Sequence, residues 1–463
     1  MNQAYCVVGG GISGLVVAYR IRTAVGEDAQ IVLFDPADRL GGVLRTEQIA
    51  GQSVDVGAEA FVARRPEVPA LLAELGLADR QIATTGVRPT IYSQRRLHPL
   101  PADTVAGIPA TAQSVAGLVD RATLERITAE PGRPLDWHPG SDPAVGAVVA
   151  DRFGEQVVAR SLDPMLSGVY AGSADSIGIR SAAPTVAAAL DAGAPSLTEA
   201  VRRAPAGGAR GPVFGAIEGG YRVLLDALTA RARPQWQQTA VRTLAATDAG
   251  WSLTDTDGRV WPAHAVVIAT PAPQAAGLLS TAAPRAAAAA ARIPVASSAV
   301  LAMAVPAGTP LPPQSGVLVA TGEDLHAKAI TLTTRKWGAR GPAELVRMSF
   351  GRFGDDLARS ASDERLRTWA IEDLRTVFGI AAEPIDILVH RWIDALPQYG
   401  PGHATLAAAV RAALPPGLAV AGNYLDGIGV PACVAAAGRA VEAALAPRAA
   451  PPPARPMAPP VAP

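Results

Sequence analysis

The glycine-rich segment near the N-terminus restricts the possible folds more than any other feature of this sequence. Gly9-Gly10-Gly11-Ile12-Ser13-Gly14 matches the pattern G-x-G-x-x-G, between an apolar run at residues 4–8 and an apolar-periodic stretch that reaches Val25. A second apolar run, residues 30–34, ends at Asp35. In such a β-α-β unit the glycines let a pyrophosphate approach the positive end of the helix, and the acid accepts hydrogen bonds from ribose hydroxyls. The sequence therefore predicts a Rossmann-like dinucleotide site.

Length and charge exclude several classes of function. A chain of 463 residues is longer than one ordinary hydrophobic core accommodates, so two or three domains are expected. Its 41 basic and 41 acidic side chains cancel, which removes the long-range field that attracts nucleic acid. Only Lys328 and Lys336 are lysines, and no G-x-x-x-x-G-K-[ST] phosphate loop occurs. We therefore expect no nucleic-acid partner and no ATP hydrolysis of that type.

Cysteines and histidines indicate neither a disulfide framework nor a metal site. Cys6 and Cys433 are far apart in apolar surroundings, which fits a reducing cytoplasm. No two of the six histidines have ligand spacing, so no metal is predicted. Prolines interrupt the longest uncharged stretch, residues 293–321, and no export signal is visible. We expect a cytoplasmic protein without a transmembrane segment.

Two further glycine-containing segments follow the fingerprint. Arg39-Leu40-Gly41-Gly42-Val43 supplies a second glycine pair, which alone would indicate a turn but which permits close backbone approach to a ligand. Joined to the fingerprint, it resembles the second FAD signature of the flavin amine oxidase superfamily. Asp55-Val56-Gly57-Ala58-Glu59-Ala60 resembles the next FAD-contacting loop of that superfamily, in which E-x-G is more common.

The C-terminal segment narrows the resemblance to one branch. Residues 421–433, with Gly427-Ile428-Gly429-Val430 at their centre, look like the closing FAD motif of the oxygen-dependent coproporphyrinogen III and protoporphyrinogen oxidase family. The resemblance covers nearly everything but the tail, and it is strongest to the coproporphyrinogen-type enzymes of actinobacteria. It continues through residues 152–154, 168–172, 218–220, 391–392 and 397–403.

The resemblance implies cofactor contacts at particular positions. Asp35 would hold the adenosine ribose, Val241 would contact adenine, and Ile428 to Val430 would line the isoalloxazine end. Cys433 falls within the expected final helix and is interpreted as a buried small residue, so the FAD is expected to be non-covalent. The expected FAD contacts are Gly9, Gly10, Gly11, Ile12, Ser13, Gly14, Asp35, Arg39, Gly41, Gly42, Val43, Gly57, Ala58, Glu59, Ala60, Val241, Asn423, Ile428, Gly429 and Val430.

The order of apolar runs predicts an α/β and α+β architecture, in which a discontinuous Rossmann-like FAD-binding domain carries an inserted mixed-sheet and helical substrate domain. The expected FAD-binding domain comprises residues 1–62, 207–275 and 393–446. The expected substrate domain comprises residues 63–206 and 276–392, and a disordered Pro/Ala-rich tail follows at 447–463.

The substrate cavity is expected between the inserted domain and the flavin. The resemblance places Val169 and Tyr170 on one side of it and Met348 and Phe350 on the other, although such apolar residues are often only core. Arg65 is the expected partner of a substrate propionate. Arg335, Lys336 and Arg347 on the inserted sheet are further candidates for binding a ligand.

The activity implied by the resemblance is FAD-dependent, oxygen-consuming oxidation of coproporphyrinogen III to coproporphyrin III in haem biosynthesis, with release of hydrogen peroxide. No catalytic side chain is expected, because flavin N5 accepts the hydride. A protoporphyrinogen IX oxidase is the nearest alternative. Another flavin amine oxidase, a carotenoid desaturase and a non-redox nucleotide-fold carrier are more distant ones. The implied partners are a porphyrinogen and O2, and transient handover to a ferrochelatase stays open.

Overall fold

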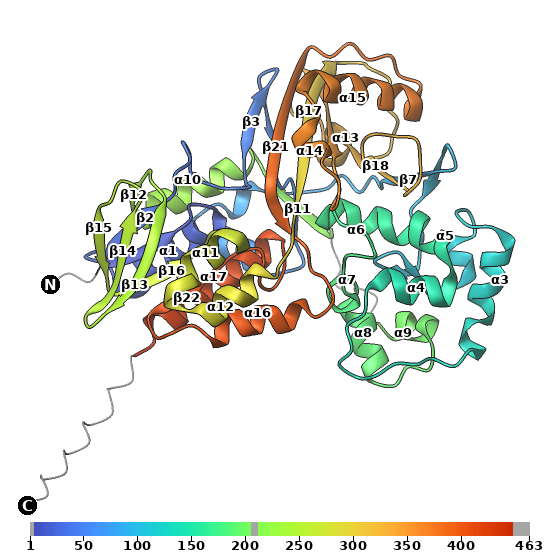
Figure 1. Ribbon diagram of the computed structural model, residues 1–463. Coiled ribbons are helices and arrows are strands. Elements are labelled where there is room, and N and C mark those ends of the chain that lie inside the picture. Colours follow the sequence, from blue (N-terminus) through green and yellow to red (C-terminus); the bar gives the residue numbers. More distant parts are fainter. Residues whose placement is uncertain (1–3, 205–211, 448–463) are drawn as a thin grey trace, which may run out of the picture.

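The computed structural model describes residues 4–204 and 212–447. It has three parts: a parallel sheet with helices on both faces, a larger mixed sheet, and a lobe of helices (Figure 1). The predicted tail at 447–463 lies, apart from its first residue, outside the described residues.

The five-stranded parallel sheet has the order β12-β2-β1-β16-β22. The central strand β1 pairs in parallel with β2 on one side and with β16 on the other. The strand order therefore reverses at β1, and sheets of this kind bind ligands at the carboxyl ends of the strands at such a point. The strands are β1 (Ala4–Val8), β2 (Gln30–Phe34), β12 (Gln235–Gln237), β16 (Ala265–Ile268) and β22 (Leu418–Val420).

Helices cover both faces of this sheet, so its strands are buried on both sides and are continuous apolar runs in the sequence. One face carries α1 (Ile12–Val25), α2 (Glu67–Glu74), α10 (Tyr221–Ala232) and α17 (Val430–Leu445). The other carries α11 (Ala272–Ala282), α12 (Pro284–Ala291), α16 (His403–Ala412) and the antiparallel sheet of β13 (Val241–Thr247), β14 (Gly250–Asp255) and β15 (Val260–Ala263).

Two segments pack differently from what the expected domain bounds imply. Leu71 of α2 is buried in one cluster with Leu15 of α1, and Leu279 of α11 is buried in the other cluster with Val266 of β16. Residues 67–74 and 272–291 therefore pack with the parallel sheet, whereas 67–74 and 276–291 were expected in the substrate domain. The sequence alone does not show which sheet such a helix covers, because an amphipathic helix has the same sequence pattern in either case.

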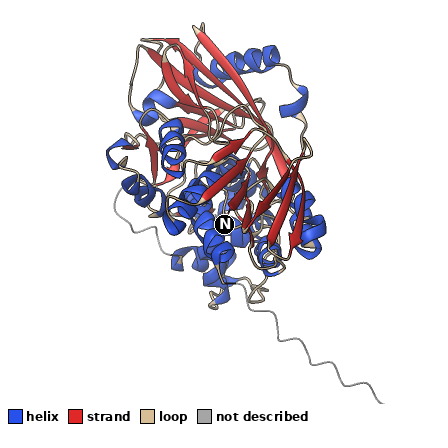
Figure 2. Cartoon of the chain, turned by 90° about the vertical axis from the view of Figure 1, so that its left-hand side faces the viewer, coloured by secondary structure: helices blue, strands red, loops and turns tan. Residues whose placement is uncertain are grey.

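The larger sheet has seven strands in the order β21-β17-β20-β19-β18-β7-β8, seen at the top of Figure 2. The helices α14 (Leu357–Ser360) and α15 (Asp363–Phe378) cover one face. The opposite face meets the hairpin of β3 (Thr46–Ile49) and β4 (Gln52–Asp55), and α13 (Thr333–Trp337) connects β19 to β20. The strands are β7 (Thr90–Ser93), β8 (Arg96–Pro99), β17 (Val295–Pro306), β18 (Gly316–Val319), β19 (Ala329–Leu332), β20 (Ala343–Phe350) and β21 (Asp386–Pro397).

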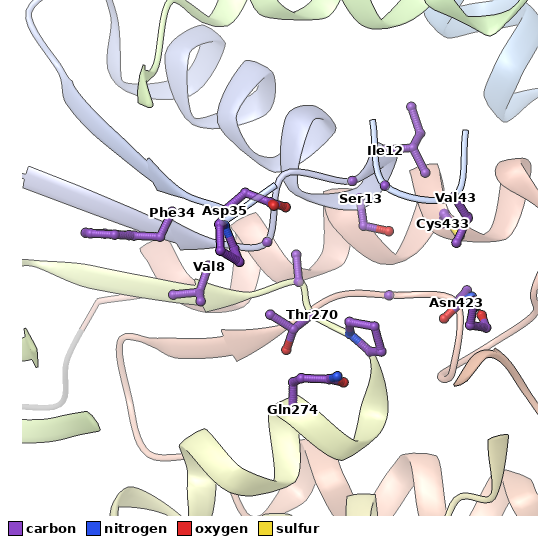
Figure 3. A pocket seen from close by; sticks show the side chains of 18 of the residues that line it. Val8, Ile12, Ser13, Phe34, Asp35, Val43, Thr270, Gln274, Asn423 and Cys433 are labelled. Carbon is purple, nitrogen blue, oxygen red and sulfur yellow. Dashed lines mark hydrogen bonds between the residues drawn. The ribbon is translucent and has the colours of Figure 1, made fainter. Parts of the chain in front are cut away.

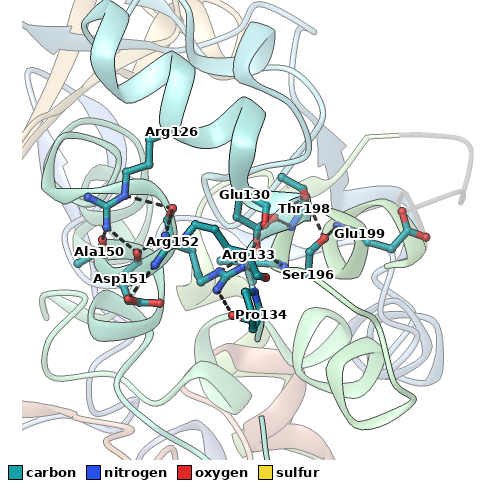
Figure 4. Close-up of polar contacts among 11 residues, drawn as sticks. Arg126, Glu130, Arg133, Pro134, Ala150, Asp151, Arg152, Ser196, Thr198 and Glu199 are labelled. Carbon is teal, nitrogen blue, oxygen red and sulfur yellow. Dashed lines mark hydrogen bonds and ion pairs between the residues drawn. The ribbon is translucent and has the colours of Figure 1, made fainter. Parts of the chain in front are cut away.

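The helical lobe has its own hydrophobic cluster and a buried ion pair. The Arg152 guanidinium lies 2.9 Å from the Glu130 carboxylate, which also accepts hydrogen bonds from Leu197 and Thr198 (Figure 4). Ser196 caps α9, because its hydroxyl accepts from the Glu199 N–H at 3.1 Å. The helices are α3 (Arg121–Ala129), α4 (Val145–Phe153), α5 (Glu155–Val157), α6 (Asp163–Tyr170), α7 (Ile179–Ala182), α8 (Pro184–Asp191) and α9 (Leu197–Arg203).

Short strands and turns connect these parts. The described part of the chain also contains β5 (Phe61–Val62), β6 (Gln81–Ala83), β9 (Thr104–Val105), β10 (Ile108–Pro109), β11 (Phe214–Ile217), 3-10 turns at Ala78–Arg80, Ala112–Val115 and Glu130–Gly132, and a π-helical turn at Val158–Leu162.

Candidate functional site

A pocket of about 530 Å³ opens at the carboxyl ends of β1, β2 and β16 (Figure 3). Phe34 and Asp35 contribute from β2 and its end, Thr270 from the end of β16, and Asn423 from the segment before α17. The pocket brings together many of the expected cofactor residues, although they come from distant parts of the chain. Those that line it are Gly9, Gly11, Ile12, Ser13, Asp35, Gly42, Val43, Ala58, Val241, Asn423, Ile428 and Val430.

The glycines of the fingerprint serve two different purposes. A Cβ on Gly9 would lie 2.7 Å from the Ala269 carbonyl, and one on Gly14 would lie 1.8 Å from the Gly9 oxygen. These two are required by the protein's own packing. Gly11 has an ordinary φ of −72°, and its Cβ would come no closer than 3.7 Å, to Gly42 Cα. The protein therefore leaves room at Gly11, on the pocket wall, and the glycine keeps that backbone open to a ligand.

The first turn of α1 supplies an anion site beside Gly11. The helix begins at Ile12, and its N-cap makes no side-chain hydrogen bond. The first N–H groups of a helix have no intrahelical acceptor, and the helix dipole adds positive charge there. The second glycine pair packs against this turn, because Gly41 N–H donates to the Gly10 carbonyl at 2.8 Å. This arrangement suits a pyrophosphate.

Asp35 is fixed at the edge of the same pocket. Its carboxylate accepts hydrogen bonds from Gly10 N–H at 2.6 Å and from Ala37 N–H at 2.9 Å. These bonds orient the acid and leave further lone pairs for the hydroxyls of a ribose. Together, the open backbone at Gly11, the first N–H groups of α1 and the oriented carboxylate of Asp35 fit a dinucleotide such as FAD.

The remaining expected cofactor residues are not among those that line this pocket. Arg39 donates to the carbonyls of Leu40, Gly42 and Leu44, and so it shapes the second glycine loop. Direct FAD contact by these residues stays a prediction. The set is Gly10, Gly14, Arg39, Gly41, Gly57, Glu59, Ala60 and Gly429.

The larger sheet clamps the loop at residues 57–59. The Glu59 carboxylate accepts hydrogen bonds from Lys336 Nζ at 2.6 Å and Trp337 Nε1 at 3.0 Å, and Arg347 donates to the Gly57 carbonyl. Burial would raise the pKa of Glu59, but the Lys336 and Arg347 cations outweigh it and lower that pKa. Lys336 and Arg347, expected as candidates for binding a ligand, are therefore engaged with this loop. Arg335 pairs with Glu344 instead.

The sequence analysis missed several pocket residues. Thr270 Oγ1 is buried and has no partner among the described residues, which leaves it available to a bound ligand. A signal for it existed, because Thr270 and Pro271 directly follow the buried strand β16, and ligands bind at that end of such strands. Gln274 and Ala395 also line the pocket, but no local pattern marks them.

Cys433 lines the pocket beside Ser13, and only 4% of its surface is exposed. Burial raises the pKa of its thiol to about 11. The thiolate is the nucleophilic form of cysteine, so a thiol protonated at neutral pH does not favour covalent attachment of a cofactor.

Met348 and Phe350, which were expected to line the substrate cavity, lie on the face of β20 that α15 covers. Both are fully buried in the cluster beneath α15. Because successive side chains on a strand point to opposite faces, Arg347 and Ser349 of β20 are the residues on the other face, and both are half-buried. A shift of one residue exchanges the two faces of a strand, and the apolar pattern does not show which partner covers which face.

Val169 and Tyr170 lie at the end of α6, where Val169 is 53% exposed. The rings of Tyr170 and Tyr399 are 5.8 Å apart. Tyr399 donates to the Asn423 carbonyl at 2.6 Å and accepts from Gly427 N–H at 2.8 Å, so it connects Tyr170 to the pocket wall. A substrate-binding role for Val169 and Tyr170 remains a proposal.

Arg65 lies on the surface and forms an ion pair with Glu67. Within the described ranges, no recorded hydrogen bond or ion pair joins it to the pocket. Its role in propionate binding therefore stays a prediction.

The surroundings of the pocket offer neither a metal site nor a membrane-spanning helix among the described residues. Among residues 4–204 and 212–447, no group of three or more His, Cys, Asp or Glu side chains gathers as a metal site. No helix in the same ranges is long and apolar enough to span a membrane. His390 of β21 lies near Arg45 and Arg39; burial, followed by these two cations, lowers its pKa to about 4. The imidazole is therefore neutral at physiological pH.

The fold and the pocket together define a dinucleotide-binding protein in which a second sheet and a helical lobe approach the cofactor site. The sequence pattern described as "Flavin containing amine oxidoreductase" matches residues 12–445. Coproporphyrinogen III oxidase of Mycobacterium tuberculosis is 65% identical over 95% of this chain and 96% of that protein. The enzyme of the same name from Mycobacterium leprae is 62% identical over 96% and 98%.

A solved structure shows the same fold. It is that of a protein from Exiguobacterium assigned to the protoporphyrinogen oxidases, with a TM-score of 0.84, 28% identity, and coverage of 96% of this chain and 98% of that one. The chain therefore belongs to the flavin containing amine oxidoreductase family, in the branch that includes the coproporphyrinogen III oxidases. This membership confirms the resemblance and the flavin expected from the sequence.

Proposed function

We propose that this protein is an FAD-dependent oxidase that converts coproporphyrinogen III to coproporphyrin III in haem biosynthesis, with O2 as the electron acceptor. The observation that carries the proposal is the 65% identity to a coproporphyrinogen III oxidase, which extends through the pocket and through both of the parts that face it. The protoporphyrinogen alternative rests on a 28% identical relative and is weaker.

A bound flavin would supply the redox chemistry, which is three two-electron oxidations of the substrate per porphyrin, balanced by reduction of three O2 to three hydrogen peroxide molecules. The residues of this chain would bind and orient the cofactor and would enclose the site. Gly11 and the first turn of α1 would hold the pyrophosphate, and Asp35 would hold the ribose. The clamp of Lys336 on Glu59 would fix the loop that carries Ala58 into the pocket.

Several finer assignments belong to the same proposal. The FAD is held non-covalently, because the Cys433 thiol is buried and its pKa is raised. The enzyme is placed in the cytoplasm, where the unpaired Cys6 and Cys433 would remain reduced. Transient transfer of the porphyrin to a ferrochelatase would follow the oxidation.

Oxygen consumption by the purified flavoprotein tests the class of reaction. Coproporphyrinogen III should consume oxygen and yield porphyrin fluorescence together with hydrogen peroxide. Two controls are a primary amine, for an amine oxidase, and NADH, for a nicotinamide-dependent enzyme. Neither should cause oxygen consumption. Rapid oxygen uptake with the amine, or rapid flavin reduction by NADH, would remove the porphyrinogen assignment.

A further inference from the structure

The turn that follows β20 carries an arginine with unoccupied hydrogen-bond donors. Arg352 is half-buried, and its Nη2 donates only to the Val319 carbonyl, at 3.4 Å. Within residues 4–204 and 212–447, Arg352 forms no ion pair. A guanidinium has five N–H donors, so most of those on Arg352 remain available to a ligand.

The nearest carboxylates do not satisfy this cation. Asp163 and Asp355 both influence Arg352 electrostatically. Asp163, however, already accepts hydrogen bonds from Ala174 N–H and Thr321 Oγ1, each at 2.7 Å. Asp355 accepts from the backbone N–H of Arg352 itself at 2.7 Å, which fixes the turn and leaves the guanidinium free.

A buried lysine lies beneath the same turn. Lys328 is 5% exposed, and its ammonium donates to Ser298 Oγ at 2.8 Å and to the carbonyls of Phe350 at 3.3 Å and Gly351 at 2.5 Å. These bonds use all three ammonium donors on the residues around Arg352. Burial, and next the positive charge of Arg352, lower the pKa of Lys328 to about 7. Lys328 therefore holds the turn and does not itself contact a ligand.

The turn contacts the end of α6, and the two segments together expose apolar surface. Phe353 N–H donates to the Ala171 carbonyl at 2.6 Å, directly after Val169 and Tyr170 of α6. The side chains of Phe353 and Val169 are large and apolar, yet the residues are 38% and 53% exposed. Through Tyr170 and Tyr399 this surface is joined to the pocket wall, as described above.

An apolar surface beside a cation with free donors matches the chemistry of an apolar macrocycle with carboxylate side chains. We propose that Arg352 binds a propionate carboxylate of the tetrapyrrole, that Val169 and Phe353 contact the ring edge, and that Lys328 is a positioning residue for Arg352. The proposal rests on the proposed function. Arg352 is a better candidate than Arg65 for binding the propionate, because the ion pair between Arg65 and Glu67 would first have to break.

Binding of the product tests the proposal without turnover. Coproporphyrin III is titrated into the FAD-loaded protein, and the Kd is read from quenching of its fluorescence. Arg352→Gln should raise the Kd about tenfold, because one sheltered charge-assisted interaction is lost. The tetramethyl ester of coproporphyrin III has no carboxylate and should bind both proteins equally. Arg375→Gln, an exposed arginine on α15 over the other face of the sheet, is the matched control and should change nothing.

Kinetics separate positioning from a general structural role. Arg352→Gln and Lys328→Met should each raise the KM for coproporphyrinogen III, with kcat and FAD content unchanged. The inference is overturned if wild-type protein oxidises coproporphyrinogen III but Arg352→Gln alters neither Kd nor KM. The inference is also overturned if Arg352→Gln weakens binding of the tetramethyl ester as much as it weakens binding of coproporphyrin III. If instead the wild-type protein oxidises no porphyrinogen, the proposed function itself fails.

Discussion

Gly11 and Gly14 stand three positions apart, yet the structure gives them different reasons to be glycine. Gly11→Val should yield a folded protein that lacks FAD, because its side chain would fill space meant for the pyrophosphate while touching little of the protein. The cost in unfolding free energy should be about 1 kcal/mol, as expected for an altered N-cap. The measurement is flavin absorbance per protein, together with circular dichroism.

Gly14→Val provides the contrast for that experiment. Its Cβ would overlap the Gly9 carbonyl, so the variant should fail to fold. Full flavin content in folded Gly11→Val protein would show that the dinucleotide site has been misplaced.

The Cys433 thiol allows a second prediction about a single residue. Because its pKa is raised to about 11, it stays protonated and unreactive at neutral pH. Acid precipitation of the wild-type protein should therefore release the flavin into the supernatant, and Cys433→Ser should behave the same way. Flavin that stays with the wild-type pellet but is released from Cys433→Ser would instead indicate a covalent bond.

The elements around the site depend on buried charges, and Asp55 at the end of β4 is one of them. Burial raises its pKa to about 7 from a model-peptide value of 3.8, although Thr46 and the backbone of Tyr221 donate hydrogen bonds to it. Between these values the folded state binds a proton that the unfolded state lacks, so the unfolding free energy falls as pH rises through this window.

Asp55→Asn should remove that contribution. The fall in unfolding free energy between about pH 4 and pH 7 should be shallower in the variant than in wild type, measured by denaturant titration at each pH. Equal slopes for the two proteins would mean that Asp55 titrates normally in the folded state.

The ion pair between Glu130 and Arg152 stabilises the helical lobe from within. Glu130→Ala would leave the Arg152 charge buried without a partner, which should cost about 3–5 kcal/mol of unfolding free energy. Glu125→Ala breaks the exposed pair with Arg121 in the same lobe and should cost little. Thermal unfolding checks both, and an equal loss in the two variants would contradict the account.

Local signals explain which of these elements the sequence could predict. The glycine fingerprint, the apolar runs of the parallel strands and the cap at Ser196 each lie within a few residues of the element that they specify, and the structure contains all of them. The face to which Phe350 points depends on α15, which is distant in sequence, so the pattern of β20 alone could not reveal it. The surroundings of Arg352 likewise come from separate segments, namely Val319 of β18, Lys328 before β19 and Ala171 after α6.

In the whole molecule, the cofactor pocket lies at the parallel sheet, and both of the other parts contact its surroundings. The larger sheet reaches the loop at residues 57–59 through Lys336 and Arg347. Tyr170 of the helical lobe contacts Tyr399, whose hydroxyl donates to Asn423 of the pocket wall. A macrocycle bound between these parts would contact the flavin end of the pocket and the turn at Arg352 together. The account therefore predicts that the four-propionate substrate is preferred over the two-propionate one.

The ratio of kcat/KM for coproporphyrinogen III and protoporphyrinogen IX, measured with the same purified protein at saturating oxygen, tests this claim most directly. The account predicts at least a tenfold preference for coproporphyrinogen III, because one sheltered contact to a carboxylate contributes about a factor of ten to binding. Faster turnover of protoporphyrinogen IX would contradict it.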